Sequence, residues 1–243
     1  MGGGGSTVES LSQRIPVFAQ EYRVLAYDNR GYGRSDAPDI PYRMEMFADD
    51  LAELLDAIDI DSAHVSGESF GGEIAQYFAL RYPERVRSLI LTSTYCGRVH
   101  GIRSAEADKF ETDRAKMTPE ERARTQIRLF MTQEFAYKNP HIMQRMMEHP
   151  APTLPKGAIR QIQAEMAADT YECLPQIKAS TLIIHGEADN ALPVENARIL
   201  ASRIPNAELV ILKGVGHLLI EAGEEPNRIM LDFLKRHSKT EKK

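Results

Sequence analysis

The sequence predicts an α/β protein: a mostly parallel, doubly wound sheet with a helical insertion. Short apolar runs typical of strands alternate with amphipathic segments typical of helices, which favours right-handed crossovers and helices on both faces of the sheet. One apolar run, Ala63 to Ser66, leads through a glycine-rich turn directly into a helical segment. Residues 97–174 interrupt the alternation with helical patterns and no convincing strand.

The first part of the chain is rich in loops. Met1 to Ser6 contains a run of glycines, which in isolation would be a flexible linker or a cloning scar. Val8 to Glu21 has apolar residues at helical spacing and predicts a short helix that Pro16 would kink or end. Tyr22 to Tyr27 predicts a strand, and the polar, glycine-containing residues 28–36 predict the loop that ends it.

The rest of the core continues the alternation. Met44 to Ile58 places apolar residues at helical spacing and acids on the other face, so it predicts a surface helix. The further expected strands are Ala63 to Ser66, Val86 to Leu91, Thr181 to His185 and Glu208 to Leu212, and the further expected helices are Glu73 to Arg81, Glu195 to Arg203 and Glu225 to Lys235.

The insertion predicts a second structural unit. A helical stretch of this length after a sheet strand is typical of a cap over the strand ends, so we expect a core of residues 1–96 and 175–237 and a cap of residues 97–174. The charged residues 238–243 predict a disordered tail. The helical patches of the cap are Pro119 to Gln133, His141 to Glu148 and Ala158 to Ala168.

Composition excludes several function classes. The chain is 42% hydrophobic and 27% charged with a net charge of -5, which is ordinary for a globular protein and argues against a nucleic-acid surface. No apolar run approaches the ~20 residues of a membrane span. Cys96 and Cys173 show no C-x-x-C spacing, so we expect free thiols in a reducing cytoplasm, no metal and no cofactor.

The residues 67–71, Gly-Glu-Ser-Phe-Gly, form a G-x-S-x-G pattern between the predicted strand and helix. A serine that must project from the end of a strand needs a sharp turn, and glycines on either side let strand and helix approach closely. The bare pattern also occurs by chance, but the strand before it and the helix after it favour a nucleophile elbow. Ser69 is therefore a candidate nucleophile.

A serine hydroxyl needs a base, and the base works best when a carboxylate fixes its tautomer. Asp189 follows one predicted strand, and His217 follows the next strand in a loop with a glycine before it. Serine, acid and histidine thus occur in the chain order of a hydrolase triad on this fold class.

These motifs together resemble the α/β-hydrolase fold family, over nearly the whole chain from Gly2 to about Arg236. The resemblance is closest to capped, cofactor-free members such as carboxylesterases, enol-lactone hydrolases and carbon-carbon bond hydrolases. It implies that Ser69 is the nucleophile, Asp189 the acid and His217 the base. The matching segments are the D-x-R-G-x-G-x-S-D loop (28–36), the elbow (67–72), the G-x-x-D turn (186–189) and the histidine turn (216–217).

The resemblance also implies an oxyanion hole. The family uses the backbone N–H after the nucleophile, here that of Phe70, and an N–H from a loop that usually begins His-Gly. Residues 2–6 match that loop with Met1 at the histidine position, so Gly3 is the second expected donor.

One departure from the family concerns the N-terminal strands. Family members have roughly three strands before this loop, and none is present here. The sequence leaves open a truncation, one piece of a split protein, or strand exchange or homo-oligomerisation that compensates. Restoring ~25 upstream residues is expected to raise stability and turnover.

Other candidates have structural explanations. Glu68 is expected to raise the pKa of His217 or to hydrogen-bond within the elbow. Asp28 is an alternative acid, but it precedes the elbow and is expected to order its own loop with Arg30. Two strand histidines, His64 and His185, are expected to be core residues. Three apolar residues that could line a substrate pocket are Phe135, Tyr137 and Leu218.

The expected function is therefore a serine hydrolase that cleaves small carboxylic esters or lactones through an acyl-enzyme on Ser69. The alternatives are a carbon-carbon bond hydrolase with the same triad, and a catalytically weak or ligand-binding member of the fold. The expected partner is a small molecule, with neither nucleic acid nor membrane.

Overall fold

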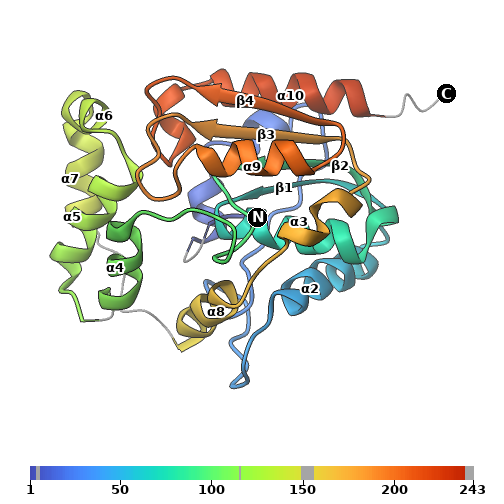
Figure 1. The fold of residues 1–243 in the computed structure, drawn as a ribbon, viewed down its shortest axis with the longest axis horizontal. Helices are drawn as coiled ribbons and strands as arrows, with labels where there is room; N and C mark the ends of the chain where they lie inside the picture. The colour runs from blue at the N-terminus through green and yellow to red at the C-terminus, as the bar shows by residue number, and fades with distance from the viewer. Residues whose placement is uncertain (4–5, 115, 149–155, 239–243) are drawn as a thin grey trace.

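The structure, a computed structural model, describes residues 1–3, 6–114, 116–148 and 156–238. Within these residues the sheet has four parallel strands in the order β1-β2-β3-β4 (Figure 1). The parallel α/β architecture predicted from the sequence is confirmed. The strands are β1 (Ala63–Glu68), β2 (Val86–Thr92), β3 (Thr181–Gly186) and β4 (Ala207–Leu212).

Helices connect and surround the strands. Those of the sheet region are α1 (Ile15–Phe18), α2 (Met44–Ala57), α3 (Phe70–Arg81), α9 (Glu195–Arg203) and α10 (Glu225–His237). Those between β2 and β3 are α4 (Ala105–Asp113), α5 (Pro119–Phe130), α6 (Gln133–Lys138), α7 (Pro140–Glu148) and α8 (Lys156–Met166). Short 3₁₀ turns are η1 (Val8–Leu11), η2 (Pro83–Arg85), η3 (Tyr171–Gln176) and η4 (Leu219–Ala222).

Both faces of the sheet are covered by helices. On one face α2, α3 and α9 bury a cluster that includes Leu55, Phe78 and Leu200. On the other face α10 packs Met230 and Phe233 against the strands. The parallel sheet is thus flanked by helices on both faces, as the sequence predicts.

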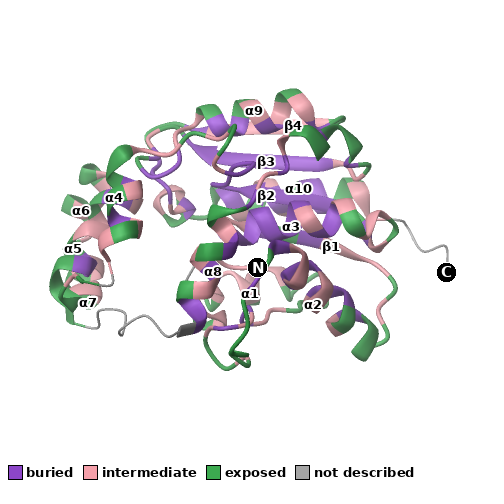
Figure 2. Cartoon of the chain, turned by 60° about the horizontal axis from the view of Figure 1, so that its bottom comes forward, coloured by how far each residue is buried: buried purple, intermediate pink, exposed green. Residues whose placement is uncertain are grey.

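The third strand lies at the centre of the buried sheet. All six residues of β3 are buried, and β2 and β4 hydrogen-bond to it on either side (Figure 2). A strand buried on both faces reads as a continuous apolar run, which explains why Thr181 to His185 was recognisable from sequence. The loop that follows β3 is consequently held by a rigid element.

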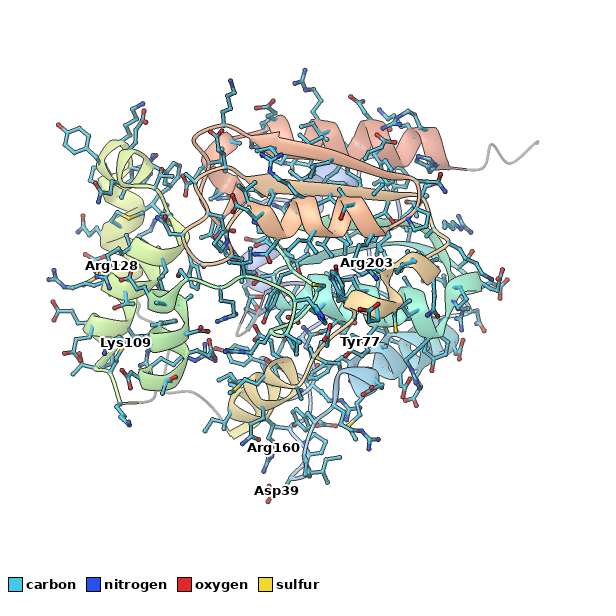
Figure 3. The ribbon with its side chains drawn as sticks, in the orientation of Figure 1. Asp39, Tyr77, Lys109, Arg128, Arg160 and Arg203 are labelled. Carbon is cyan, nitrogen blue, oxygen red and sulfur yellow. The ribbon has the colours of Figure 1, made fainter. Side chains whose placement is uncertain are left out.

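Four of the five helices in residues 97–174 lie away from the core helices. Figure 1 shows α4 to α7 gathered beyond the carboxyl ends of the strands, while α8 lies next to α2. Arg160 of α8 pairs with Asp39, near the loop before α2 (Figure 3). The division into core and cap stays a prediction. The expected disordered tail lies outside the described residues from 239 onward.

Two local predictions are wrong. Val8 to Glu21 is not one helix but the two short turns η1 and α1, because Pro16 lies in the first turn of α1. Tyr22 to Tyr27 is not a strand: Tyr22 lies in a bend, and residues 23–27 have no regular secondary structure. A strand needs a neighbour to pair with, and no described segment pairs with this one. No helix in the described residues is long and apolar enough to cross a membrane.

Candidate active site

Ser69 lies on the turn between β1 and α3. Its φ of 53° is unusual for a residue with a side chain and stores backbone strain. The flanking glycines are required by contact: a Cβ on Gly67 would lie 2.0 Å from the carbonyl oxygen of Gly71, and one on Gly71 would lie 2.5 Å from that of Met1. The Ser69 N–H donates to the Thr92 carbonyl (2.9 Å), which fixes the turn to β2. The strand-turn-helix geometry expected of an elbow is therefore present.

Asp189 and His217 are brought into contact from the loops after β3 and β4. The His217 Nδ1 lies 2.7 Å from Asp189 Oδ2, and both residues are buried. Asp189 Oδ1 accepts the backbone N–H groups of Ala191 and Leu192 (2.9 Å each). A carboxylate can only accept, so Nδ1 carries the proton and Nε2 keeps a lone pair. This pair can act as an oriented base.

The charges around His217 and Asp189 stabilise the form in which the imidazolium and the carboxylate are both charged. Burial by itself would lower the pKa of His217, but the charge and hydrogen bond of Asp189, with help from Glu68, outweigh it and raise that pKa. Burial would raise the pKa of Asp189, but His217 and His185 hold that pKa well below its ordinary range. The carboxylate stays ionised at neutral pH and stabilises an imidazolium next to it.

A second histidine also contacts the acid. His185 Nε2 lies 2.8 Å from the Leu192 carbonyl oxygen and 3.1 Å from Asp189 Oδ2. Its side chain is fully buried, as expected of a core histidine, but its contact with Asp189 was not predicted. The spacing in the sequence could have indicated this contact, because His185 is the last residue but one of β3 and Asp189 lies in the turn directly after that strand.

Ser69, Phe70 and His217 line one cavity of about 70 Å³. The ring of Phe130 lies 5.1 Å from that of His217, centroid to centroid, and forms part of the wall. Ser69 and His217 share the cavity without a direct hydrogen bond between their side chains. Such contacts are often loose before substrate binds, so the arrangement remains compatible with proton transfer.

The glycine loop lies over the elbow. A Cβ placed on Gly3 would lie 3.3 Å from Ser69 Cβ, so the backbone of Gly3 passes very close to the serine. The N–H of Phe70 is at the first helical position of α3, where no partner exists within a helix. Neither this N–H nor that of Gly3 donates to another described residue. Both candidate oxyanion donors therefore lie near Ser69; Gly4 and Gly5 are outside the described residues.

The far wall of the cavity carries charged residues that the sequence did not indicate. Arg103 bonds to Glu165 (3.2 Å), and Arg114 bonds to Glu111 (2.9 Å). All four lie between β2 and β3 and line the cavity. No motif marks them, because only tertiary packing brings them to the site. Of the expected pocket residues Phe135, Tyr137 and Leu218, none lines this cavity, and Tyr137 is 88% exposed.

The structure separates the other candidates from the catalytic pair. Asp28 is buried and accepts the N–H groups of Val8 (2.7 Å) and Arg34 (2.8 Å). It orders its loop as expected, but not through Arg30, which bonds to Asp50 instead. Glu68 Oε2 accepts from Arg14 Nη1 (3.2 Å) and also contributes to the raised pKa of His217. His64 bonds to Ser88 (2.7 Å), as a structural histidine would.

Known proteins share both the sequence and the fold. Residues 2–224 match the family described as alpha/beta hydrolase fold. A poly(3-hydroxyalkanoate) depolymerase from Ectopseudomonas oleovorans is 30% identical over 258 residues, which cover 96% of this chain and 82% of the relative. A 2-hydroxymuconate semialdehyde hydrolase from Pseudomonas sp. (strain CF600) is 31% identical over 222 residues, covering 84% and 72%.

A solved structure agrees with these relatives. The enol-lactonase from Burkholderia xenovorans LB400 is 26% identical, has a TM-score of 0.85, and is matched over 96% of this chain and 89% of its own. The position of the G-x-S-x-G turn between β1 and α3 is the site that the family resemblance anticipates. The chain belongs to the α/β-hydrolase family of enzymes.

Proposed function

We propose that this protein is a serine hydrolase that cleaves small carboxylic esters or lactones. The observation that carries the proposal is the buried His217–Asp189 pair, because His217 lines one cavity with Ser69, a half-buried serine with a strained backbone. The relatives named as an enol-lactonase and a poly(3-hydroxyalkanoate) depolymerase support the choice of ester and lactone bonds. The cavity of about 70 Å³ beside Ser69 supports a small acyl group.

The proposed reaction begins with attack of Ser69 Oγ on the substrate carbonyl. His217 takes the serine proton through Nε2, and Asp189 stabilises the imidazolium that forms. The N–H groups of Phe70 and Gly3 donate to the developing oxyanion. His217 then returns the proton to the leaving alcohol, which leaves an acyl-enzyme on Ser69.

The second half repeats these steps with water. His217 removes a proton from the attacking water, the same two N–H groups hold the second oxyanion, and the acid leaves as Ser69 recovers its proton. In this scheme the nucleophile, the base and the oxyanion donors all come from the chain, and water is the second reactant. The reducing compartment expected from the sequence is supported by the two free thiols of Cys96 and Cys173.

Active-site labelling tests this proposal. A fluorophosphonate probe is expected to modify the wild type at Ser69 and to leave Ser69→Ala unmodified, because only an activated hydroxyl attacks phosphorus quickly. A matched control is Ser93→Ala, since Ser93 is a second serine with positive φ directly after a strand, but it is fully buried. Equal labelling of wild type and Ser69→Ala would overturn the mechanism and favour a ligand-binding member of the fold.

A carbon-carbon bond hydrolase is the second candidate. The relative named as a 2-hydroxymuconate semialdehyde hydrolase, at 31% identity, favours it. Turnover of p-nitrophenyl acetate is compared with turnover of a vinylogous diketone acid. Faster kcat/KM for the ester supports the leading proposal, and faster kcat/KM for the diketone acid supports the alternative.

A further inference from the structure

The acid Asp189 has a second histidine neighbour that the proposed reaction does not use. His185 Nε2 lies 3.1 Å from Asp189 Oδ2, the same oxygen that His217 Nδ1 approaches to 2.7 Å. The side chains of His185 and Asp189 are fully buried, and that of His217 is nearly so. Contacts with a carboxylate are stronger in such a water-free site than in solvent, so the second imidazole affects the acid.

The hydrogen-bond partners of His185 fix its tautomer. Its Nε2 lies 2.8 Å from the Leu192 carbonyl oxygen, which can only accept, so Nε2 carries the proton. Its Nδ1 is buried and has no hydrogen-bond partner among the described residues. A second proton on Nδ1 would be buried without an acceptor, which is costly. His185 therefore presents a single N–H, and this N–H lies between the Leu192 carbonyl and Asp189 Oδ2.

The two oxygens of Asp189 are held in different ways. Oδ1 accepts the backbone N–H groups of Ala191 and Leu192 (2.9 Å each), whereas Oδ2 lies between the two imidazoles. The carbonyl of the same Leu192 accepts from His185, so this histidine also holds the loop that orients the acid. A change at His185 consequently alters the surroundings of Oδ2, while the Ala191 N–H still holds Oδ1.

The place of His185 relative to His217 is set by contact between two turns. His185 belongs to β3, which is paired on both sides and cannot shift easily. A Cβ on Gly186 would lie 2.1 Å from the Gly216 carbonyl oxygen, so the turn after β3 packs directly against the turn that carries His217. Both imidazoles are thus brought to the acid by the rigid part of the fold.

We propose that His185 is a positioning residue that shares Asp189 Oδ2 with His217 and thereby limits the strength of the Asp189–His217 contact. The inference rests on the proposed serine-hydrolase reaction, in which His217 must be neutral to accept the Ser69 proton. A carboxylate beside a second N–H is less basic, because that N–H stabilises its charged form. It therefore stabilises a neighbouring imidazolium less than a carboxylate with one imidazole neighbour would.

The charges around the pair have the signs that this role requires. Burial would raise the pKa of Asp189, but His217 and His185 together hold it well below its ordinary range. Burial lowers the pKa of His217 and Asp189 raises it; of the other charges, Glu68 raises this pKa and Arg103 lowers it. Glu68 and Arg103 bond to residues other than His185, so a substitution of His185 leaves both effects in place.

The test measures His217 directly by NMR in the full chain labelled with ¹⁵N-histidine. Glutamine places an amide N–H near the position of Nε2, whereas leucine has no donor, so His185→Gln is the conservative partner of His185→Leu. The pKa of His217 is expected to rise by about half a pH unit or more in His185→Leu and to stay close to the wild-type value in His185→Gln. An unchanged pKa of His217 in His185→Leu would overturn the proposal.

Two further measurements do not depend on the leucine variant. The wild-type spectrum is expected to show His185 as the Nε2–H tautomer at neutral pH, and the Nδ1–H tautomer would contradict the proposal. His185→Asn keeps a polar side chain whose shorter amide does not reach the Leu192 carbonyl. It is expected to raise the pKa of His217 as leucine does, and it replaces leucine if that variant does not fold.

A matched control separates this role from packing. His64→Leu removes another strand histidine, which bonds to Ser88, so it is expected to lower the denaturant midpoint without moving the pKa of His217. An equal rise in both leucine variants would assign the shift to general destabilisation and overturn the proposal.

Enzyme kinetics link this role to the reaction. The acid limb of the kcat/KM profile on p-nitrophenyl acetate is expected to move to higher pH in His185→Leu, together with the pKa of His217. Fluorophosphonate labelling distinguishes the two proposals. A wild type that is not labelled at Ser69 contradicts the serine-hydrolase reaction, whereas normal labelling with an unmoved acid limb in His185→Leu contradicts only the role of His185.

Discussion

The two halves of the candidate site are held in very different ways. The acid and base, Asp189 and His217, follow β3 and β4, and β3 is buried and paired on both sides. The proposed oxyanion donor Gly3 belongs to a loop on the free edge of β1, where Met1 makes two backbone hydrogen bonds. Several independent contacts thus fix the proton-transfer groups, whereas the described part of the oxyanion loop is held to β1 through the two backbone hydrogen bonds of Met1.

This difference predicts two kinds of effect for substitutions in the two regions. Substitutions at the acid-base pair change the chemistry but leave a rigid scaffold, because neighbouring contacts such as Asp189 with Ala191 and Leu192 come from the backbone. Substitutions at the free edge of β1 are expected to shift the position of the oxyanion loop more than they change the reacting groups. The predictions below compare the two halves, beginning with the largest expected effect.

Asp189→Asn is expected to reduce kcat by roughly 10⁴-fold with little change in fold, because an amide favours the wrong tautomer of His217. The measurement is steady-state kinetics on p-nitrophenyl acetate with circular dichroism. The matched control is Asp28→Asn, which alters another buried aspartate that hydrogen-bonds to backbone N–H groups. A comparable loss of kcat in the control would assign the acid role to Asp28.

The stability of the two regions is expected to differ as well. Leu182→Ala, in the buried strand β3, is expected to lower the free energy of unfolding by about 2–5 kcal/mol. Leu25→Ala, beside the free edge and 40% exposed, is expected to change it by less than about 0.5 kcal/mol. Urea denaturation measures both. Equal losses would show that the residues around β1 are as tightly packed as β3.

Gly3→Pro removes one proposed oxyanion donor. It is expected to lower kcat by about 10²–10³-fold with a smaller effect on KM, as expected for a contact made in the transition state. Gly3→Ala keeps the N–H, and its Cβ would lie 3.3 Å from Ser69 Cβ, so only a small shift is needed. A loss in Gly3→Ala as large as in Gly3→Pro would mean that crowding of Ser69, not the N–H, matters.

The sequence predicted the catalytic residues correctly where a local motif directly follows a strand, because the strand also sets the position of that motif in the fold. The elbow at Ser69 and the turns that carry Asp189 and His217 each follow a strand of the parallel sheet, and parallel strands bring their carboxyl ends to one edge. The strand prediction for Tyr22 to Tyr27 failed for a complementary reason: its composition suits a strand, but a strand also needs a neighbour.

The residues of the cavity wall could not be predicted from local sequence patterns. Tertiary packing alone brings four charged residues to the cavity that Ser69 lines, and no spacing in the sequence encodes that arrangement. They are Arg103, Glu111, Arg114 and Glu165. Charged residues on amphipathic helices are usually solvated, so their presence in the sequence does not mark a site. Substrate preference depends on such contacts, which explains why sequence motifs identify the reaction class before the substrate.

The smallest expected effect concerns Glu68, which lies between the two halves. His217 must be neutral to act as a base, so kcat/KM falls as pH decreases through its raised pKa. Glu68→Gln removes a negative charge that helps to raise this pKa, so the acid limb of the pH profile is expected to move to lower pH. Arg14→Gln breaks the same Arg14–Glu68 ion pair but leaves the carboxylate, so its limb is not expected to move to lower pH. If the acid limb moved to lower pH in both variants, the loss of the Arg14–Glu68 ion pair would be the cause. The charge of Glu68 would then not explain the shift, and the ion pair would act through the position of the β1 edge.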